Sequence, residues 1–379
     1  MTVRSIAQSP LAPFALASLL ALAGCGSAPS KPAATTTVAQ AVAKIDHDAW
    51  ASLGYRLDWQ GFPFAGTIAN PKITFVTPSA NHVLVQETNS YVSLLEVNNG
   101  ARRWSVEFGN SLTKFVGLNA DQADANRIFV SAESELFIVA AQTGGITSRE
   151  RFDKVVNTKP ILMDGLAIYG TSNGEVLAHR PGATLKAWGY GTGSAIEAAP
   201  AVTTDGVAIV TINGDVLFFT PSGLLQGRNM ILSSTSTNPV SSGGLLAIAG
   251  LDQSLWCFDQ KGNQVWRLRQ SAPLTVQPTA LENSVVCELP ETGLTNVDFA
   301  SGNVLWSNPK VRGTVVASHN GRLVVWNGTA ASLVDAKRGD LLTSVDLPGI
   351  VSLTADQFDG GNLYAATAEG SIAKFRLRK

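Results

Sequence analysis

The sequence contains few of the residue patterns on which enzyme sites depend. Its 379 residues include three cysteines and four histidines, with no adjacent cysteines, no Cys-x-x-Cys-His and no His-x-x-x-His. Metal and haem sites rely on such short spacings because neighbouring ligands must converge on one group. No Gly-x-Ser-x-Gly elbow, phosphate-binding loop or dinucleotide fingerprint stands between a predicted strand and a predicted helix. The sequence therefore predicts no catalytic residue, no metal and no cofactor, and it favours a binding protein over an enzyme.

Charged residues are also scarce. They make up 15% of the chain, and the 28 basic residues are balanced by 29 acidic ones. A protein that binds nucleic acid needs a concentrated positive field to neutralise phosphates. The near balance of charge provides no such field, which argues against a nucleic-acid partner.

Apolar runs long enough to span a membrane are missing. The apolar run at the N-terminus, residues 11–24, has 14 residues, whereas a spanning helix needs about 20. Arg4 precedes this run, and small residues end it. A basic residue, a short apolar run and a small-residue end are typical of an export signal. We therefore predict that residues 1–24 are a signal peptide.

The end of this segment, Leu22-Ala23-Gly24-Cys25, resembles a bacterial lipobox. The resemblance implies that the Cys25 thiol carries a diacylglycerol and that Cys25 becomes the mature N-terminus. Two or three acyl chains would then anchor the protein stably on a membrane. An ordinary signal peptide with an incidental cysteine is the alternative interpretation.

The residues after Cys25 are predicted to form a tether. Gly26 and Ser27 follow the cysteine without an Asp, which in the Gram-negative sorting rule favours the outer membrane. Ser, Ala, Pro, Lys and Thr then dominate, so residues 25–54 are expected to be flexible, with a short helix over Val42–Leu53.

Glycine is abundant, with 35 copies, and several copies recur at a regular interval. Three are followed by tryptophan four residues later, namely Gly100 by Trp104, Gly262 by Trp266 and Gly302 by Trp306. Weaker copies follow the glycines at positions 144, 182, 223 and 339, and Trp188 stands six residues after its glycine. Successive marker glycines are 37 to 44 residues apart, a period that indicates a repeat architecture.

Each period has the pattern of short strands joined by tight turns. In the third unit, the β-rich runs Leu166–Gly170 and Val176–Ala178 are separated by Asn173-Gly174. The fourth unit repeats this order around Asn213-Gly214. Asn-Gly between such runs predicts a type I′ turn, in which both central residues have positive φ. With the glycine turn and the tryptophan strand added, each period supplies about four antiparallel strands.

Four short strands in forty residues are typical of a propeller blade. Residues 55–379 span 325 positions, which is enough for eight such units, although the count also allows seven. We therefore expect an all-β, eight-bladed β-propeller with four-stranded antiparallel blades. The last blade would combine C-terminal strands within Asn362–Leu377 with the strand Tyr55–Trp59, because an open ring would leave sheet edges exposed.

Segments 95–104, 258–266 and 297–306 resemble the repeat of the pyrroloquinoline-quinone-like propellers. The consensus of that repeat is roughly Ala-Leu-Asp, two or three residues, Gly and then Trp. A large flat ring on one blade can dock on the next blade. We expect this blade-stacking role, rather than cofactor stacking, for five tryptophans: Trp59, Trp104, Trp188, Trp266 and Trp306.

The chain departs from the quinone-dependent dehydrogenases that share this repeat. In that group of enzymes the chains are longer, with an adjacent cysteine pair below the cofactor and a Ca²⁺ site next to a catalytic Asp. This sequence has no adjacent cysteines. Asp298 and Asp335 both stand four residues before a marker glycine, and a repeated position of this kind predicts turn caps rather than catalytic bases. Cys257 and Cys287 fall on neighbouring units. The sequence is compatible with a disulfide between them and equally with two separate buried thiols.

With its lipobox, tether and length, the whole chain resembles the propeller lipoproteins of the machinery that assembles outer-membrane β-barrels. The resemblance implies a scaffold on the periplasmic side of the outer membrane, monomeric within a complex, that binds protein partners through loops or blade edges. The longer predicted loops, Asn110–Ala125 and Arg228–Asn238, are the expected contact segments. The alternatives are a propeller that binds a small molecule or glycan in its central channel and a quinone-dependent dehydrogenase.

Overall fold

The computed structural model describes residues 44–63, 72–110 and 112–378. The predicted signal peptide, Cys25 and most of the predicted tether lie outside these residues. Among the described residues, no helix has both the length and the apolar character needed to cross a membrane.

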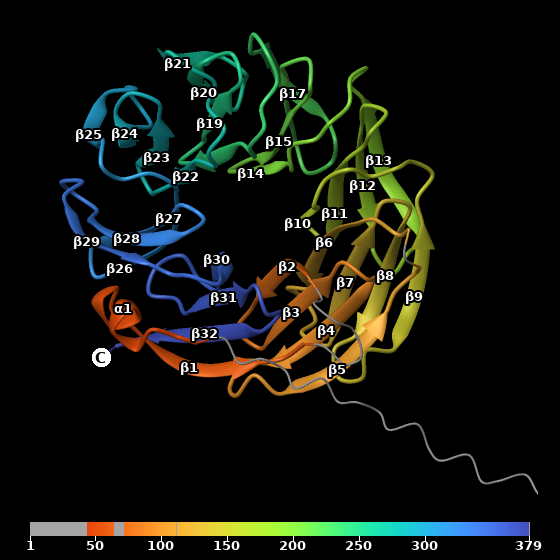
Figure 1. Ribbon diagram of the computed structural model, residues 1–379. Helices are drawn as coiled ribbons and strands as arrows, with labels where there is room; N and C mark the ends of the chain where they lie inside the picture. Colours follow the sequence, from red (N-terminus) through yellow and green to blue (C-terminus); the bar gives the residue numbers. More distant parts are fainter. Residues whose placement is uncertain (1–43, 64–71, 111, 379) are drawn as a thin grey trace, which may run out of the picture. The chain divides into compact units, whose positions relative to one another are not determined.

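The described residues form one short helix and 32 strands, arranged as eight four-stranded antiparallel sheets around an axis (Figure 1). The helix is α1 (His47–Ser52). Blades 1 to 4 contain β2 (Ile73–Pro78), β3 (His82–Glu87), β4 (Tyr91–Glu96), β5 (Arg102–Glu107), β6 (Phe115–Ala120), β7 (Arg127–Ala132), β8 (Glu135–Ala140), β9 (Ile146–Arg151), β10 (Ile161–Met163), β11 (Leu166–Gly170), β12 (Glu175–Arg180), β13 (Leu185–Gly191), β14 (Ala201–Thr203), β15 (Gly206–Val210), β16 (Asp215–Phe219) and β17 (Leu225–Met230).

Blades 5 to 8 complete the ring. They contain β18 (Val240–Ser242), β19 (Leu245–Gly250), β20 (Ser254–Asp259), β21 (Gln264–Arg269), β22 (Thr279–Ala280), β23 (Ser284–Leu289), β24 (Gly293–Asp298), β25 (Val304–Asn308), β26 (Thr314–His319), β27 (Arg322–Trp326), β28 (Ala330–Asp335), β29 (Leu341–Asp346), β30 (Ile350–Ala355), β31 (Leu363–Thr367), β32 (Ile372–Leu377) and β1 (Tyr55–Gly61).

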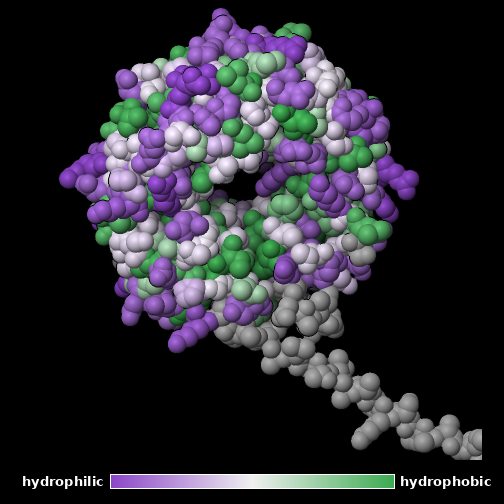
Figure 2. Space-filling model, turned by 45° about the horizontal axis from the view of Figure 1, so that its top comes forward, coloured by the Kyte–Doolittle hydropathy of each residue, from purple (hydrophilic) through white to green (hydrophobic). Residues whose placement is uncertain are grey.

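The structure confirms the predicted fold class and shows eight blades rather than seven. The last blade has the strand order β1-β32-β31-β30, in which Tyr55 lies opposite Leu377. The ring is therefore closed by the N-terminal strand, as predicted. The first strand of blade 8, β30, also contacts the first strand of blade 1, β2, next to the axis. Figure 2 shows the opening of the central channel inside this ring.

The second and third strands of each blade are covered on both sides, because every blade packs between two others. β11 and β15 are buried at every position, whereas the outermost strand β13 is exposed or half-buried along its whole length. A strand covered on both sides has no solvent face to mark with polar residues. This explains why the sequence shows short continuous apolar runs rather than strict alternation.

A proline stands immediately before the innermost strand in four consecutive blades. These residues are Pro160, Pro200, Pro239 and Pro278, which precede β10, β14, β18 and β22. Proline has no backbone N–H, so it is compatible with the first residue of a strand at a sheet edge. Here the innermost strands are such edges, and in these four blades they are only two or three residues long.

The prediction of type I′ turns at Asn173-Gly174 and Asn213-Gly214 was wrong. Only the glycine has positive φ in each pair, and the Gly174 N–H donates to Thr171 O at 3.3 Å within a three-residue loop. In a three-residue hairpin loop, a type I turn is followed by one left-handed residue, which is the glycine. Paired positive φ occurs instead at other hairpins, for example Asp164-Gly165 and Asn320-Gly321.

The two predicted contact loops also need correction. Residues 115–120, inside the first of them, form the innermost strand β6, and the second begins within β17. Polar residues flank β6, and β17 itself contains Gln226, Arg228 and Asn229, so the sequence pattern concealed both strands. The predicted helix is confirmed only over His47–Ser52, where the Asp46 carboxylate caps the first turn by accepting hydrogen bonds of 3.0 Å from the N–H groups of Asp48 and Ala49.

Candidate functional site

The five tryptophans identified in the sequence occupy equivalent positions on outermost strands. Trp104 on β5 is 8% exposed, and its Nε1 donates to Ala141 O in blade 2 at 2.8 Å. Its ring lies over Gly144 of blade 2, where an added Cβ would come within 2.7 Å of the ring. Four other pairs repeat both contacts, namely Trp59 with Val97 and Gly100, Trp188 with Pro221 and Gly223, Trp266 with Phe299 and Gly302, and Trp306 with Ala336 and Gly339.

Trp188 is in register with the other four, although it follows Gly182 by six residues. It lies opposite Ala178, ten residues earlier, just as Trp104 lies opposite Leu94. The residue four positions before it, Thr184, adopts the left-handed conformation with φ 51°. The glycine of this turn is therefore the displaced residue, and a threonine takes the left-handed position that glycine holds in the other blades.

Three seams between blades lack the tryptophan. At the seam of blades 2 and 3, Glu150 of β9 is fully buried and lies 2.6 Å from His179 Nε2 on β12. Its other carboxylate oxygen accepts the Gly182 N–H of blade 3 at 2.9 Å. A buried polar cross-link thus replaces indole packing here. At the seam of blades 4 and 5, Gly227 lets the Lys261 backbone approach directly, where an added Cβ would come within 2.3 Å of it.

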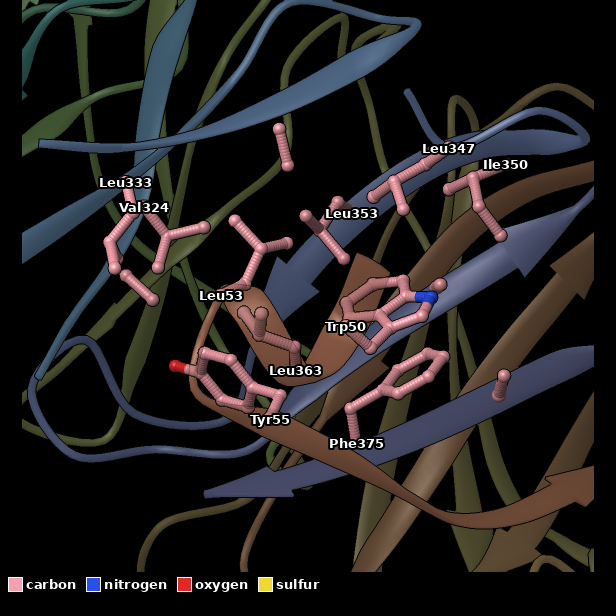
Figure 3. Packing of buried hydrophobic residues seen from close by; sticks show 14 residues of the cluster. Trp50, Leu53, Tyr55, Val324, Leu333, Leu347, Ile350, Leu353, Leu363 and Phe375 are labelled. Atoms are coloured by element: carbon pink, nitrogen blue, oxygen red, sulfur yellow. The ribbon is translucent and has the colours of Figure 1, made fainter. Parts of the chain in front are cut away.

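The seam of blades 7 and 8 is filled by a residue outside the repeats. Thr343 of β29 lies opposite Leu333, the place that tryptophan takes in five other blades. Trp50 of α1 is 1% exposed and stacks on Phe375 of β32, with ring centroids 3.5 Å apart and planes inclined by 11° (Figure 3). Sequence reasoning missed this contact because Trp50 lies before the first repeat.

The residues that could support chemistry are engaged in the fold. The Asp298 carboxylate accepts the Ser301 N–H, and the Asp335 carboxylate accepts the N–H groups of Lys337 and Arg338, so both cap turns as predicted. Cys257 and Cys287 are free, buried thiols, and burial raises the pKa of each to about 12. No group of three potential metal-ligating side chains occurs among the described residues.

Of the four histidines, His47 is exposed on α1, and the other three are buried in strands: His82, His179 and His319. Burial lowers the pKa of His82 and of His319, which favours their neutral forms.

One buried acid was not identified from the sequence. Glu87 at the end of β3 is 2% exposed, and its Oε1 has no hydrogen-bond partner in the part of the chain that the structure describes. Burial raises its pKa to about 7. An acidic residue two positions after the apolar run Val83-Leu84-Val85, in the same strand, was the available signal.

An exposed apolar surface lies on the loops over blades 3 to 5 and on the end of strand β17. It consists of Val155, Ile212, Met230 and Leu232, which are 48%, 41%, 54% and 68% exposed. We call these four residues the loop surface. The connection 231–239, which includes Leu232, contains no charged residue. Grouped apolar side chains in solvent mark interaction surfaces on soluble proteins.

Backbone hydrogen bonds hold the loops of this surface in place. Val155 O accepts from Ser172 N in blade 3 at 3.0 Å, and Ile212 N donates to Ala195 O at 2.9 Å. Next to Leu232, Ile231 N donates to Gly214 O at 2.8 Å. The apolar side chains are thus presented on a preformed backbone, which reduces the ordering cost of binding. Only Met230 and Leu232 lie within a predicted contact segment.

Fold and repeat together define the chain as an eight-bladed propeller with a recurrent Gly-x-x-x-Trp signature. The model of the family described as outer membrane protein assembly factor BamB matches residues 88–231 and 219–378. These matches cover more than half of the chain, and the chain therefore belongs to the BamB family.

Individual relatives agree with this assignment. The outer membrane protein assembly factor BamB of Burkholderia pseudomallei is 23% identical over 320 residues, covering 78% of this chain and 82% of the relative. The BamB of Bordetella pertussis is 26% identical over 165 residues, covering 40% of this chain and 42% of the relative. Both relatives are described as assembly factors, a description that includes no reaction.

Solved structures show the same fold at low sequence identity. The crystal structure of BamB from Moraxella catarrhalis superimposes with a TM-score of 0.64 at 17% identity, covering 80% of this chain and 94% of that one. The computationally designed protein Ika8 superimposes with a TM-score of 0.70 at 14% identity, covering 85% of this chain and 99% of that one. A designed protein shares the architecture as closely as a natural relative does, so the fold alone does not define the function.

Proposed function

We propose that this protein is a non-enzymatic scaffold that binds protein partners during the assembly of outer-membrane β-barrel proteins. It acts on the periplasmic side of the outer membrane, held there by a lipid on Cys25, and works as a monomer within a larger complex. Family membership supports the assembly role, and the loop surface supplies the place where a partner docks.

The observation that carries the proposal is the exposure of Leu232 and its neighbours on ordered loops. Leu232 is 68% exposed, and burial of a leucine side chain in an interface contributes about 1.5–3 kcal/mol. Leaving such apolar side chains in water is unfavourable, so covering them with a partner contributes favourably to the free energy of binding. A rigid apolar surface beside the uncharged connection 231–239 suits a protein partner better than a charged or small polar ligand.

The test is crosslinking and affinity capture from cell envelopes. Leu232→Asp places a charge on the most exposed side chain of the loop surface and is expected to reduce recovery of the assembly partner at least about tenfold. Leu224→Asp is a matched control, because Leu224 is also 68% exposed but lies at the opposite end of β17. Equal loss in both variants, or recovery of no barrel-assembly protein by the unmodified chain, would contradict the proposal.

The same preparation separates the alternatives. A stoichiometric quinone with its absorbance would indicate a dehydrogenase instead. A small molecule or glycan that co-purifies with the unmodified chain would indicate ligand binding in the channel. Substitutions of residues that line the central channel should then release it, whereas Leu232→Asp should not.

The lipid anchor has a separate test. Cys25→Ser removes the thiol that would be acylated, and the variant is expected in the soluble periplasmic fraction, whereas the unmodified chain is expected in the membrane fraction. Mass spectrometry of the mature N-terminus measures the acylation directly. Retention of the variant on membranes would show that another feature holds the protein there.

A further inference from the structure

A pocket of about 450 Å³ lies between α1, the start of β1 and the end of β32. Its lining comes from both sides: His47, Asp48 and Ala51 from the helix, and Tyr55, Arg56 and Arg378 from the strands. The volume lies within the range of about 300–1,000 Å³ typical of small-molecule sites.

Core packing holds the two walls of this pocket in fixed positions. Trp50, on the opposite side of α1 from solvent, stacks on Phe375 of β32 (Figure 3). The residue after the helix, Leu53, accepts a hydrogen bond of 3.0 Å at its carbonyl from His319 Nε2. On the strand side, Arg378 N donates to Gly54 O at 2.9 Å. The helix therefore cannot move away from the strands without loss of core contacts.

Three exposed arginines lie at or just beyond this end of the strand pair formed by β1 and β32. Arg56 lies directly opposite Arg376 in the strand pair, and Arg378 follows on the same strand end. Like charges placed opposite each other destabilise a strand pair. Asp58, an acidic residue of this strand pair, forms two ion pairs. Its Oδ1 lies 3.2 Å from Arg376 Nε, and its Oδ2 lies 3.5 Å from Lys374 Nζ. Within the described residues, the guanidinium groups of Arg56 and Arg378 have no ion-pair partner.

Two unpaired guanidinium groups and one imidazole thus face a pocket that holds a single carboxylate, Asp48. Planar guanidinium groups present paired N–H donors that match the oxygen atoms of a phosphate group. An anion bound here would neutralise part of the positive charge of these two arginines.

We propose that this pocket binds a phosphate group, held by Arg56 and Arg378 with His47 as a further N–H donor. The group comes either from the headgroup of a membrane lipid or from a soluble phosphate ester. The lipid source rests on the proposed function, because the lipid on Cys25 would keep the propeller beside a membrane. The phosphate site itself does not depend on that anchor.

The test uses the full chain with Cys25→Ser, so that no acyl chain contributes to binding. Inorganic phosphate and glycerol 3-phosphate are titrated by calorimetry against this chain and against a second chain that also carries Arg56→Gln and Arg378→Gln. Affinity is expected to fall roughly tenfold or more in the second chain, because each charge-assisted hydrogen bond is lost. Arg151→Gln with Arg269→Gln is the control, since it removes the same charge from the exposed strands β9 and β21.

Vesicles of phosphatidylcholine with and without phosphatidylglycerol distinguish the two sources. Capture by phosphatidylglycerol that requires Arg56 and Arg378 supports the lipid headgroup. Binding of glycerol 3-phosphate without vesicle capture supports a soluble ester at the same site. Absence of phosphate binding, equal loss in the control, or binding of an oligoglutamate peptide without phosphate would overturn the proposal. None of these readouts uses the assembly partner, so failure here is distinct from failure of the scaffold role.

Discussion

The indole of Trp104 packs on Gly144 in the next blade and not on Gly100, the glycine four residues before it in its own repeat. Gly100 instead receives Trp59 from the preceding blade. The two marker residues of one repeat therefore belong to two different seams. A ring built in this way needs the last seam to be closed by an early strand, and Trp59 on β1 does so.

Gly144→Ala is expected to lower the free energy of unfolding by about 2–4 kcal/mol, from a left-handed backbone and overpacking against the indole. Gly144 has φ 74°, and the added Cβ would lie 2.7 Å from Trp104 Cδ2. Urea unfolding measures the loss. Gly145→Ala is the control, because the nearest atom to its Cβ is the Thr143 hydroxyl oxygen at 3.3 Å. Equal stability of the two variants would show that the indole contact is not a structural constraint.

Thr184→Gly is expected to stabilise the protein by about 1 kcal/mol, because a β-branched residue at φ 51° is strained and glycine is not. Thermal unfolding at a fixed protein concentration checks the gain. Thr143→Gly, in the corresponding turn of blade 2, is expected to destabilise, since Thr143 does not have positive φ. A loss of stability in Thr184→Gly would mean that the threonine side chain makes a compensating contact.

Trp50→Ala is expected to cost about 3–5 kcal/mol, the usual cost of truncating a buried tryptophan. It removes the stack on Phe375 and opens the seam between blades 7 and 8. Hydrogen exchange should then increase first in β1 and β32, before the other blades. Trp50→Phe retains a ring against Phe375 and should lose less. Uniform exchange over all blades would contradict a local role of α1.

Glu87 should make stability fall as the pH rises from about 4.5 to about 7. Its pKa is raised in the folded state, so between these values the folded protein binds more protons than the unfolded chain does. The contribution of Glu87 to the free energy of unfolding is fully present below the unfolded pKa. It is lost as the carboxyl ionises in the folded protein, which lowers the free energy of unfolding by on the order of 3 kcal/mol.

Glu87→Gln is expected to remove this part of the pH dependence, measured as the difference in urea midpoint between variant and unmodified protein across that range. The difference isolates Glu87 from His82 and His319, whose lowered pKa values act in the opposite direction. A constant difference at all pH values would show that Glu87 ionises normally.

Much of the architecture could be predicted because a blade is encoded locally. The interval between marker glycines predicts seven or eight blades, and the detached strand Tyr55–Trp59 predicts the closure of the ring. Gly-x-x-x-Trp likewise identifies the stacking tryptophans, since one turn geometry is repeated at a fixed spacing. The type I′ turns failed because Asn-Gly also suits a three-residue loop, and loop lengths depend on how neighbouring strands meet.

The sequence by itself determined the blade, a ring of seven or eight blades and the identity of the five stacking tryptophans, because each depends on contacts within about forty residues. Only the tertiary structure decided which glycine each tryptophan meets, that Trp50 fills the seam of blades 7 and 8, and that Glu150 meets His179. It also brought Arg56 and Arg378, more than three hundred positions apart in the chain, to the lining of one pocket. Such pairings arise only when the ring closes, because closure brings together residues whose separation in the chain carries no periodic signal.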